Sequence, residues 1–290
     1  MAISAADISK LRASTGAGML DCKNALEEAG GDMEKAAEIL RKKGIVKAAK
    51  RADKVASEGR VVTKVSADDK VGALVELNCE TDFVGRSDDF NKLAEMVAEV
   101  VVKKAPADLA ALNAISLEDG KTIEATIHDL TLKIGEKISL RRFARFESAG
   151  LVASYMHGTK IGVLVDLTGG TKELGVDVAM HAAASNPKYL NRAAVPSEAI
   201  AKEKEIFAEQ LRAQGKPANI IENILKGKID KYYGEVCLVE QPFIKNEELT
   251  VQKLLDQGKA TLNRFVRFEL GEGIEKASKD FASEVAEQLK

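Results

Sequence analysis

The segment Lys70-Val71-Gly72-Ala73-Leu74-Val75-Glu76-Leu77 recurs about ninety residues later as Lys160-Ile161-Gly162-Val163-Leu164-Val165-Asp166-Leu167. Each run is almost wholly apolar, which is typical of a buried strand. A shorter apolar segment and a polar turn precede each run, at residues 59–69 and 150–159. Each block therefore predicts a β-hairpin.

A second repeat places a third strand in each half of the chain. Residues 142–147 and 264–269 share the pattern Arg-Phe-apolar-Arg-Phe-Glu, and apolar residues at helical spacing follow each hairpin. The sequence thus predicts an α+β fold with two tandem duplicated units, residues 55–147 and 148–270. We expect each unit to hold a three-stranded antiparallel sheet backed by a helix, as an ancestral duplication would produce.

The region before the first unit, residues 1–54, predicts three short helices and a basic linker. Ser4 and Asp7 form a capping-box pattern before the first helix, and Gly30-Gly31 ends the second. We expect the third helix to stop at Gly44 and residues 42–54 to form an exposed helical linker. This arrangement resembles the ubiquitin-associated type of three-helix module.

The second unit carries an insertion that the first one lacks. Two apolar stripes separated by Gly215-Lys216-Pro217 predict a helical hairpin, a coiled coil, at about residues 186–230. Phe281, Val285 and Leu289 are spaced four apart, which predicts an amphipathic helix in the C-terminal region, residues 271–290.

Composition narrows the class of function. The net charge is −2 and aromatic residues make up 4% of the chain, which argues against strong nucleic-acid binding. Cys22, Cys79 and Cys237 lie far apart without a C-x-x-C pair, as expected of buried thiols in a reducing compartment. We find no phosphate loop, metal-ligand spacing, nucleophile elbow or membrane span, so an enzyme and a bound cofactor are not expected.

Six motifs in order carry a family resemblance over the whole chain. They are Thr15–Lys23, Thr81–Val84, Ser154–Gly158, Ile161–Val165, Gln241–Phe243 and Arg267–Gly273. Together they resemble bacterial translation elongation factor Ts. The resemblance implies a guanine nucleotide exchange factor that binds elongation factor Tu carrying GDP and promotes GDP release so that GTP can bind. It implies no direct nucleotide binding by this chain.

Phe83 is the residue of greatest interest, because it lies on a short strand-to-helix connection between polar residues. Such connections run over the surface, so Phe83 is either a plug on its own domain or an anchor for a partner. The resemblance favours an anchor that enters a cleft of elongation factor Tu. Asp82 would hold the loop or accept a hydrogen bond from the partner.

The resemblance assigns further contacts with elongation factor Tu to residues spread along the chain: Met19, Leu20, Lys23, Thr81, Val84, Ile134, Gly135, His157, Phe243 and Ile244. Each has an ordinary reading as well. Met19 and Leu20 would suit a core, Ile134-Gly135 a simple turn, and Phe243 packing. We expect His181, on a helix face, to lie in the core.

A rival reading is a binding module associated with the ribosome or RNA, supported by the basic linker at residues 42–54. The near-neutral charge stands against it. We expect a cytoplasmic protein of bacterial type, with a processed organellar form as the alternative. The oligomeric state is left open between a homodimer and a heterotetramer with the partner.

Overall fold

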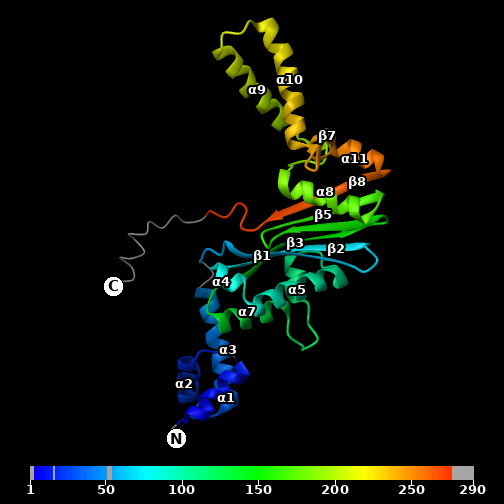
Figure 1. Ribbon diagram of the computed structural model, residues 1–290. Helices are drawn as coiled ribbons and strands as arrows, with labels where there is room; N and C mark the ends of the chain where they lie inside the picture. The colour runs from blue at the N-terminus through cyan, green and yellow to red at the C-terminus, as the bar shows by residue number, and fades with distance from the viewer. Residues whose placement is uncertain (1–2, 16, 51–53, 276–290) are drawn as a thin grey trace. The chain divides into compact units, whose positions relative to one another are not determined.

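The computed structural model describes residues 3–15, 17–50 and 54–275 and shows a mixed α+β fold (Figure 1). The chain divides into two compact units. One unit comprises the chain up to residue 62, residues 75–143 and the chain from residue 268, and the other comprises residues 63–74 and 144–267.

The first part of the chain folds into α1 (Ala5–Thr15), α2 (Met19–Glu28) and α3 (Met33–Lys50). The Asp7 amide donates to the Ser4 hydroxyl at 3.1 Å, as the capping-box pattern predicts. These helices enclose a small core that consists of Leu11, Cys22, Ala25, Leu26, Ala36 and Leu40.

The predicted stop at Gly44 is wrong, because α3 continues to Lys50. A glycine inside a helix costs only about 1 kcal/mol relative to alanine. The lysines and alanines that follow Gly44 are good helix formers, so the helix tolerates it.

The described residues form two three-stranded sheets. The first has the order β1 (Glu58–Val65), β2 (Val71–Cys79), β3 (Ile138–Glu147). The second has the order β4 (Leu151–His157), β5 (Ile161–Gly169), β8 (Ala260–Glu269). β4 pairs antiparallel with β5, with Ser154 opposite Leu164. The repeated apolar runs are therefore the central strands of both sheets, which explains why they are apolar without alternation.

Helices follow each hairpin, as predicted. In the first repeat these are α4 (Asp82–Gly85) and α5 (Asp88–Lys104), with α6 (Leu109–Ala114) and α7 (Ile123–Ile134) before β3. In the second repeat α8 (Lys172–Ser185) packs against β4 and β5.

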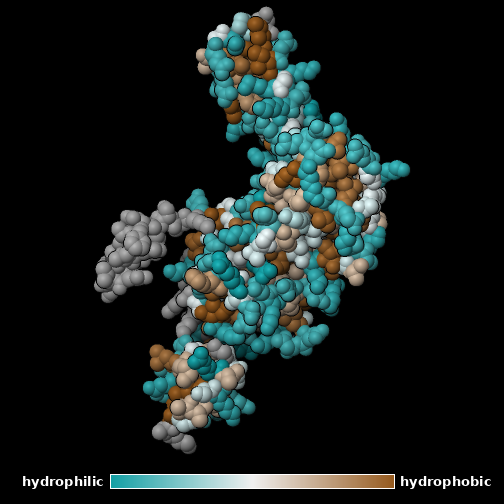
Figure 2. Space-filling model, in the orientation of Figure 1, coloured by the Kyte–Doolittle hydropathy of each residue, from teal (hydrophilic) through white to brown (hydrophobic). Residues whose placement is uncertain are grey.

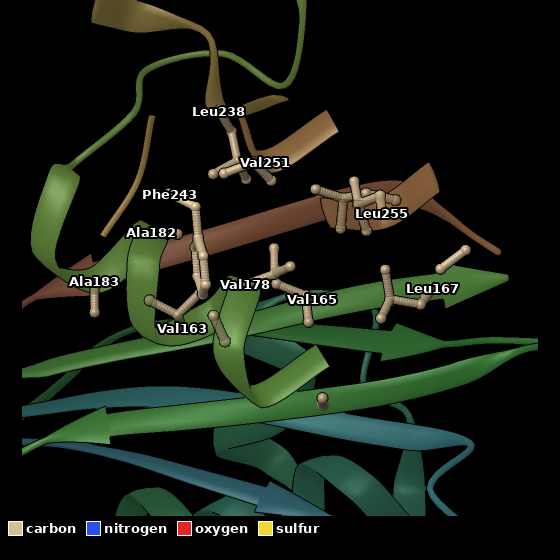
Figure 3. Packing of buried hydrophobic residues seen from close by; sticks show 14 residues of the cluster. Val163, Val165, Leu167, Val178, Ala182, Ala183, Leu238, Phe243, Val251 and Leu255 are labelled. Atoms are coloured by element: carbon tan, nitrogen blue, oxygen red, sulfur yellow. The ribbon is translucent and has the colours of Figure 1, made fainter. Parts of the chain in front are cut away.

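The second repeat also contains a β-hairpin and a helix that the sequence pattern did not predict. These are β6 (Pro242–Phe243), β7 (Asn246–Thr250) and α11 (Val251–Gln257). They complete a core of fourteen buried residues, in which Val163 and Val165 of β5 lie near Val178 of α8, and Leu167 lies farther along β5 (Figure 3).

A buried carboxylate occupies the same position in the central strand of each repeat. Glu76 is fully buried and accepts hydrogen bonds from Arg141 at 2.9 Å, Arg142 at 2.6 Å and the Gly271 amide at 2.8 Å. Burial alone would raise the pKa of Glu76, but these hydrogen bonds outweigh it and lower the pKa below its usual value.

Asp166 is the counterpart of Glu76 in β5. It accepts hydrogen bonds from Ser148 at 2.6 Å, Asn263 at 3.1 Å and Arg264 at 2.9 Å. Burial raises the pKa of Asp166, but these hydrogen bonds lower it by more, so the pKa lies below its usual value. The substitution of Asp for Glu in the repeat thus preserves one buried, paired negative charge per sheet.

The arginines of the closing strands also share one role. The Arg142 guanidinium lies 4.2 Å from the ring centroid of Phe268, and that of Arg264 lies 4.3 Å from the ring centroid of Phe146. Arg142 of the first repeat therefore stacks on Phe268 of the second, and Arg264 of the second stacks on Phe146 of the first, a reciprocal exchange that agrees with a duplication.

The insertion is a helical hairpin of α9 (Ser197–Ala213) and α10 (Ala218–Val236), joined at Gly215. The predicted end near residue 230 is wrong, because α10 continues to Val236 and packs there against Val195 and Tyr189. Apolar side chains reach the surface of the hairpin (Figure 2), and Ile206 of α9 and Ile220 of α10 are exposed. The predicted C-terminal helix, residues 278–290, lies outside the described residues.

Candidate functional site

Phe83 lies in α4, a single helical turn between β2 and α5. Thr81 caps this turn, and its hydroxyl accepts from the Val84 amide at 3.5 Å. The Phe83 side chain is 81% exposed, and Leu20, at 70%, comes next among the large apolar side chains whose exposure the structure describes. Phe83 is therefore not a plug on its own domain.

The far end of the turn is held by close backbone packing. A side-chain carbon added at Gly85 would lie 3.0 Å from the carbonyl oxygen of Gly59, so only glycine fits without a shift.

The Cys79 thiol donates to the carbonyl of Thr81 at 3.0 Å. Burial, with the charges of Glu136 and Glu58, raises the pKa of Cys79 to about 12, so this thiol stays protonated and structural.

The near end of the turn is held by Glu136, which lies in the connection between α7 and β3. One carboxylate oxygen of Glu136 accepts from the Thr81 amide at 2.9 Å and the other accepts from the Thr81 hydroxyl at 2.7 Å. Gly135, with φ of 84°, ends α7 and turns the chain so that Glu136 follows directly. The predicted residues Ile134 and Gly135 therefore directly precede Glu136, which bonds to Thr81 of the predicted Thr81–Val84 segment.

Asp82 and Val84 differ in their surroundings. Asp82 is paired with Arg86 at 2.9 Å on the surface, a contact that contributes about 0.2–1 kcal/mol at most. Val84 is buried. Within Thr81–Val84, Phe83 is thus the side chain that the fold leaves most available to a partner.

A second group of predicted residues lies at the start of α2. Leu20 is 70% exposed and Met19 is 44% exposed, whereas Cys22, Ala25 and Leu26 of the same helix are buried. Lys23 is exposed and pairs with Glu27 at 3.8 Å. Met19 and Leu20 therefore do not belong to the module core, and they form an apolar edge beside a positive charge.

The remaining predicted residues belong to the second repeat. His157 ends β4 and is exposed, with its ring stacked beside that of Tyr155 at 6.5 Å. Phe243 is buried in the core, whereas the neighbouring Ile244 is 47% exposed. Of these two neighbouring residues, only Ile244 reaches the surface.

The exposed Ile244 is fixed from behind by a buried histidine. His181 is fully buried, as expected, and its Nδ1 accepts from the Ile244 amide at 3.2 Å. Its Nε2 therefore carries the proton and donates to Gln241 at 3.0 Å. Burial lowers the pKa of His181, although the bond to Gln241 opposes this, so the ring is neutral.

Over residues 3–15, 17–50 and 54–275 we find no group of three His, Cys, Asp or Glu side chains that could hold a metal ion. In the same part of the chain, no helix is both long and apolar enough to cross a membrane.

Comparison with known proteins decides the family. Residues 80–272 match the family model described as Elongation factor TS. The chain belongs to the elongation factor Ts family. Proteins named elongation factor Ts from Methylococcus capsulatus and Thioalkalivibrio sulfidiphilus are each 50% identical to it, over 100% of this chain and 99% of the relative. The one from Burkholderia multivorans is 48% identical over 99% of this chain and 97% of the relative.

Membership of the elongation factor Ts family makes the chain a factor of translation elongation. The sequence motifs of the family did not point to Glu136, although it holds the turn that carries Phe83. The two residues in contact, Thr81 and Glu136, are 55 positions apart. No local pattern reports such a pair, and only the pairing of β2 with β3 brings it together.

Proposed function

We propose that this member of the elongation factor Ts family is a guanine nucleotide exchange factor. It binds elongation factor Tu carrying GDP and promotes GDP release so that GTP can enter. The exposure of Phe83 on a turn that is fixed at both ends supports this proposal most directly. The factor breaks no covalent bond, so it is not an enzyme, and it acts in the cytoplasm, where elongation takes place.

The exchange follows from coupling between two binding events. A factor that binds best to the nucleotide-free shape of elongation factor Tu must weaken GDP binding, and GDP must weaken factor binding by the same ratio. Burial of one Phe side chain contributes about 1.5–3 kcal/mol. If that contact forms only in the nucleotide-free shape, it changes the affinity for GDP about 10- to 150-fold, since 1.4 kcal/mol is a factor of ten.

The other predicted residues serve docking in this proposal. Met19 and Leu20 offer exposed apolar area, with Lys23 beside them. Ile134 and Gly135 directly precede Glu136, whose bonds to Thr81 clamp the turn that carries Phe83. His157 and Ile244 supply contacts from the second repeat, and Phe243 supports Ile244 from the core.

The direct test measures release of a fluorescent GDP analogue from elongation factor Tu after excess unlabelled GDP is added. We expect the release rate to rise with factor concentration and then to saturate. GDP should also weaken factor binding by the ratio by which the factor weakens GDP binding. A release rate that does not change at any factor concentration would contradict the proposal.

A further inference from the structure

We propose that Glu136 is a positioning residue for Phe83: its carboxylate holds the one-turn helix α4 in the shape that presents the aromatic ring. The inference rests on the proposed function, because it concerns how Phe83 acts on the partner. Glu136 itself lies in the turn between α7 and β3 and is half-buried.

Glu136 acts on α4 through the hydroxyl and the amide of Thr81. The Thr81 hydroxyl has one proton, and it donates this proton to Glu136 at 2.7 Å. Its lone pairs are then left to accept from the Val84 amide, which lies 3.5 Å away. The carboxylate therefore fixes the orientation of the hydroxyl that caps α4, and the second oxygen holds the Thr81 amide at 2.9 Å.

The helix α4 is too short to keep its shape without support at its ends. The helix comprises only Asp82–Gly85, and a single turn of helix is not stable by itself in water. Its shape must come from its ends. Gly85 packs against Gly59 at one end, and Glu136 holds Thr81 at the other, with Phe83 between them.

The segment that contains Glu136 is also held in return by the segment that contains Thr81. A Glu80 carboxylate oxygen accepts from the Lys137 amide at 2.6 Å, while Glu136 accepts from the Thr81 amide. Each of the two connecting segments thus places an acidic side chain on the backbone of the other. The Lys137 ammonium also donates to the carbonyl of Lys54 at 2.9 Å, which fixes the same turn to the chain that precedes β1.

The consequence concerns the entropy of binding. A fixed turn does not have to be ordered when the partner binds. More of the free energy gained by burying Phe83 therefore contributes to the affinity of the complex. If Glu136 is truncated, α4 samples other conformations and that ordering cost returns. We expect Glu136→Ala to lower the factor-stimulated rate of GDP release about 3- to 10-fold, by the cost of ordering a side chain and its turn.

The test compares variants of the full chain in the assay of GDP release from elongation factor Tu. Glu136→Gln should keep most of the rate, because its amide oxygen accepts from the Thr81 amide and its NH₂ group donates to the hydroxyl oxygen. Thr81→Val removes only the hydroxyl and should fall between Glu136→Ala and the unmodified chain. Glu95→Ala, at an exposed glutamate of α5, is the matched control and should leave the rate unchanged.

A double-mutant cycle separates positioning from a general structural effect. In a Phe83→Ala background, Glu136→Ala should cause no further loss, because the ring that it positions is absent. An equal loss in both backgrounds would overturn the inference. So would an unchanged rate for Glu136→Ala beside an impaired Phe83→Ala variant.

Hydrogen exchange tests the clamp independently of nucleotide release. In Glu136→Ala the amides of Val84 and Arg86 should exchange at least several-fold faster, while amides of β5 keep their protection. Unchanged hydrogen exchange at the Val84 and Arg86 amides would overturn the inference, even if the unmodified factor stimulates GDP release from elongation factor Tu. Faster exchange in a factor that does not stimulate GDP release would instead refute the proposed function and leave the clamp in place.

Discussion

Phe83 and Val84 are neighbours in one turn of helix, yet Phe83 is 81% exposed and Val84 is 9% exposed. Successive residues of a helix project about 100° apart, so one turn can bury one side chain and present the next. Val84 thereby anchors α4 in the fold, and Phe83 is free to contact a partner. An aromatic side chain so exposed contributes little stabilising free energy to the isolated protein and contributes most when a partner buries it in a complex.

The apolar edge of α2 supplies the first prediction. Met19→Ala combined with Leu20→Ala should weaken binding to elongation factor Tu about tenfold or more, because two exposed apolar side chains lose their burial in the complex. Equilibrium binding, measured by calorimetry, gives the effect.

The matched control is Asn24→Ala, at another exposed position of α2, which should bind normally. The melting temperature of the double variant should not change, since neither side chain belongs to the core of Leu11, Ala25 and Leu26. Normal affinity of the double variant would remove this edge from the docking surface.

The helical hairpin supplies the second prediction. Replacing residues 204–226 by a short Gly-Ser bridge should leave a cooperative fold, because the base, where Val236 packs against Val195 and Arg192 pairs with Asp230, is retained. We expect GDP release to remain stimulated at reduced efficiency, since Phe83 is intact. Complete loss of stimulation by a variant that still melts cooperatively would show that the hairpin belongs to the mechanism.

The sequence was sufficient to predict the parts of the fold that repeat. The runs around Glu76 and Asp166 occur twice, so one pattern supported the other, and both proved to be central strands with a buried carboxylate. Local signals placed Phe83 on a strand-to-helix connection but left open whether it packs on its own domain or faces a partner. The family resemblance favoured an anchor, and the 81% exposure of Phe83 excludes packing on its own domain.

The rest depended on contacts that no local pattern encodes. The continuation of α10 to Val236 follows from packing against Val195, forty-one residues earlier in the chain. The hairpin of β6 and β7 contains only two residues in its first strand and is held by the His181 bond to Ile244. Likewise, the role of Glu136 appears only when β3 is placed beside β2.

His181 supplies the third prediction, on the dependence of stability on pH. The unfolded chain binds a proton on histidine below a pKa of about 6.5, whereas the buried ring has a lowered pKa and stays neutral. Protonation would also remove the Nδ1 acceptor that the Ile244 amide requires. The contribution of His181 to stability is therefore complete above about pH 6.5 and is lost as the pH falls below it towards the folded pKa.

Urea unfolding between pH 8 and pH 5.5 measures this dependence. The free energy of unfolding should fall towards low pH more steeply for the unmodified chain than for His181→Gln, with a difference of up to about 1.4 kcal/mol per pH unit. His157→Gln, at an exposed histidine, should follow the unmodified chain. Parallel curves for His181→Gln and the unmodified chain would contradict the assignment of a neutral, bonded ring.

In this account Phe83 promotes GDP release by direct contact with elongation factor Tu, and it does not stabilise the fold of the factor itself. The chain offers a matched pair for this test, because Phe83 is 81% exposed and Phe90, seven residues later, is fully buried. Phe90→Ala should destabilise the protein by about 3–5 kcal/mol through the cavity it leaves. Phe83→Ala opens no cavity and should melt within a few degrees of the unmodified chain.

The most direct measurement is stopped-flow release of a fluorescent GDP analogue from elongation factor Tu, at saturating Phe83→Ala factor, with its melting curve recorded in parallel. We expect the stimulated rate to fall about tenfold or more, in line with the loss of about 1.5–3 kcal/mol of burial in the complex, while the melting temperature stays unchanged. An unchanged release rate per folded molecule, together with an early melting transition, would contradict the account.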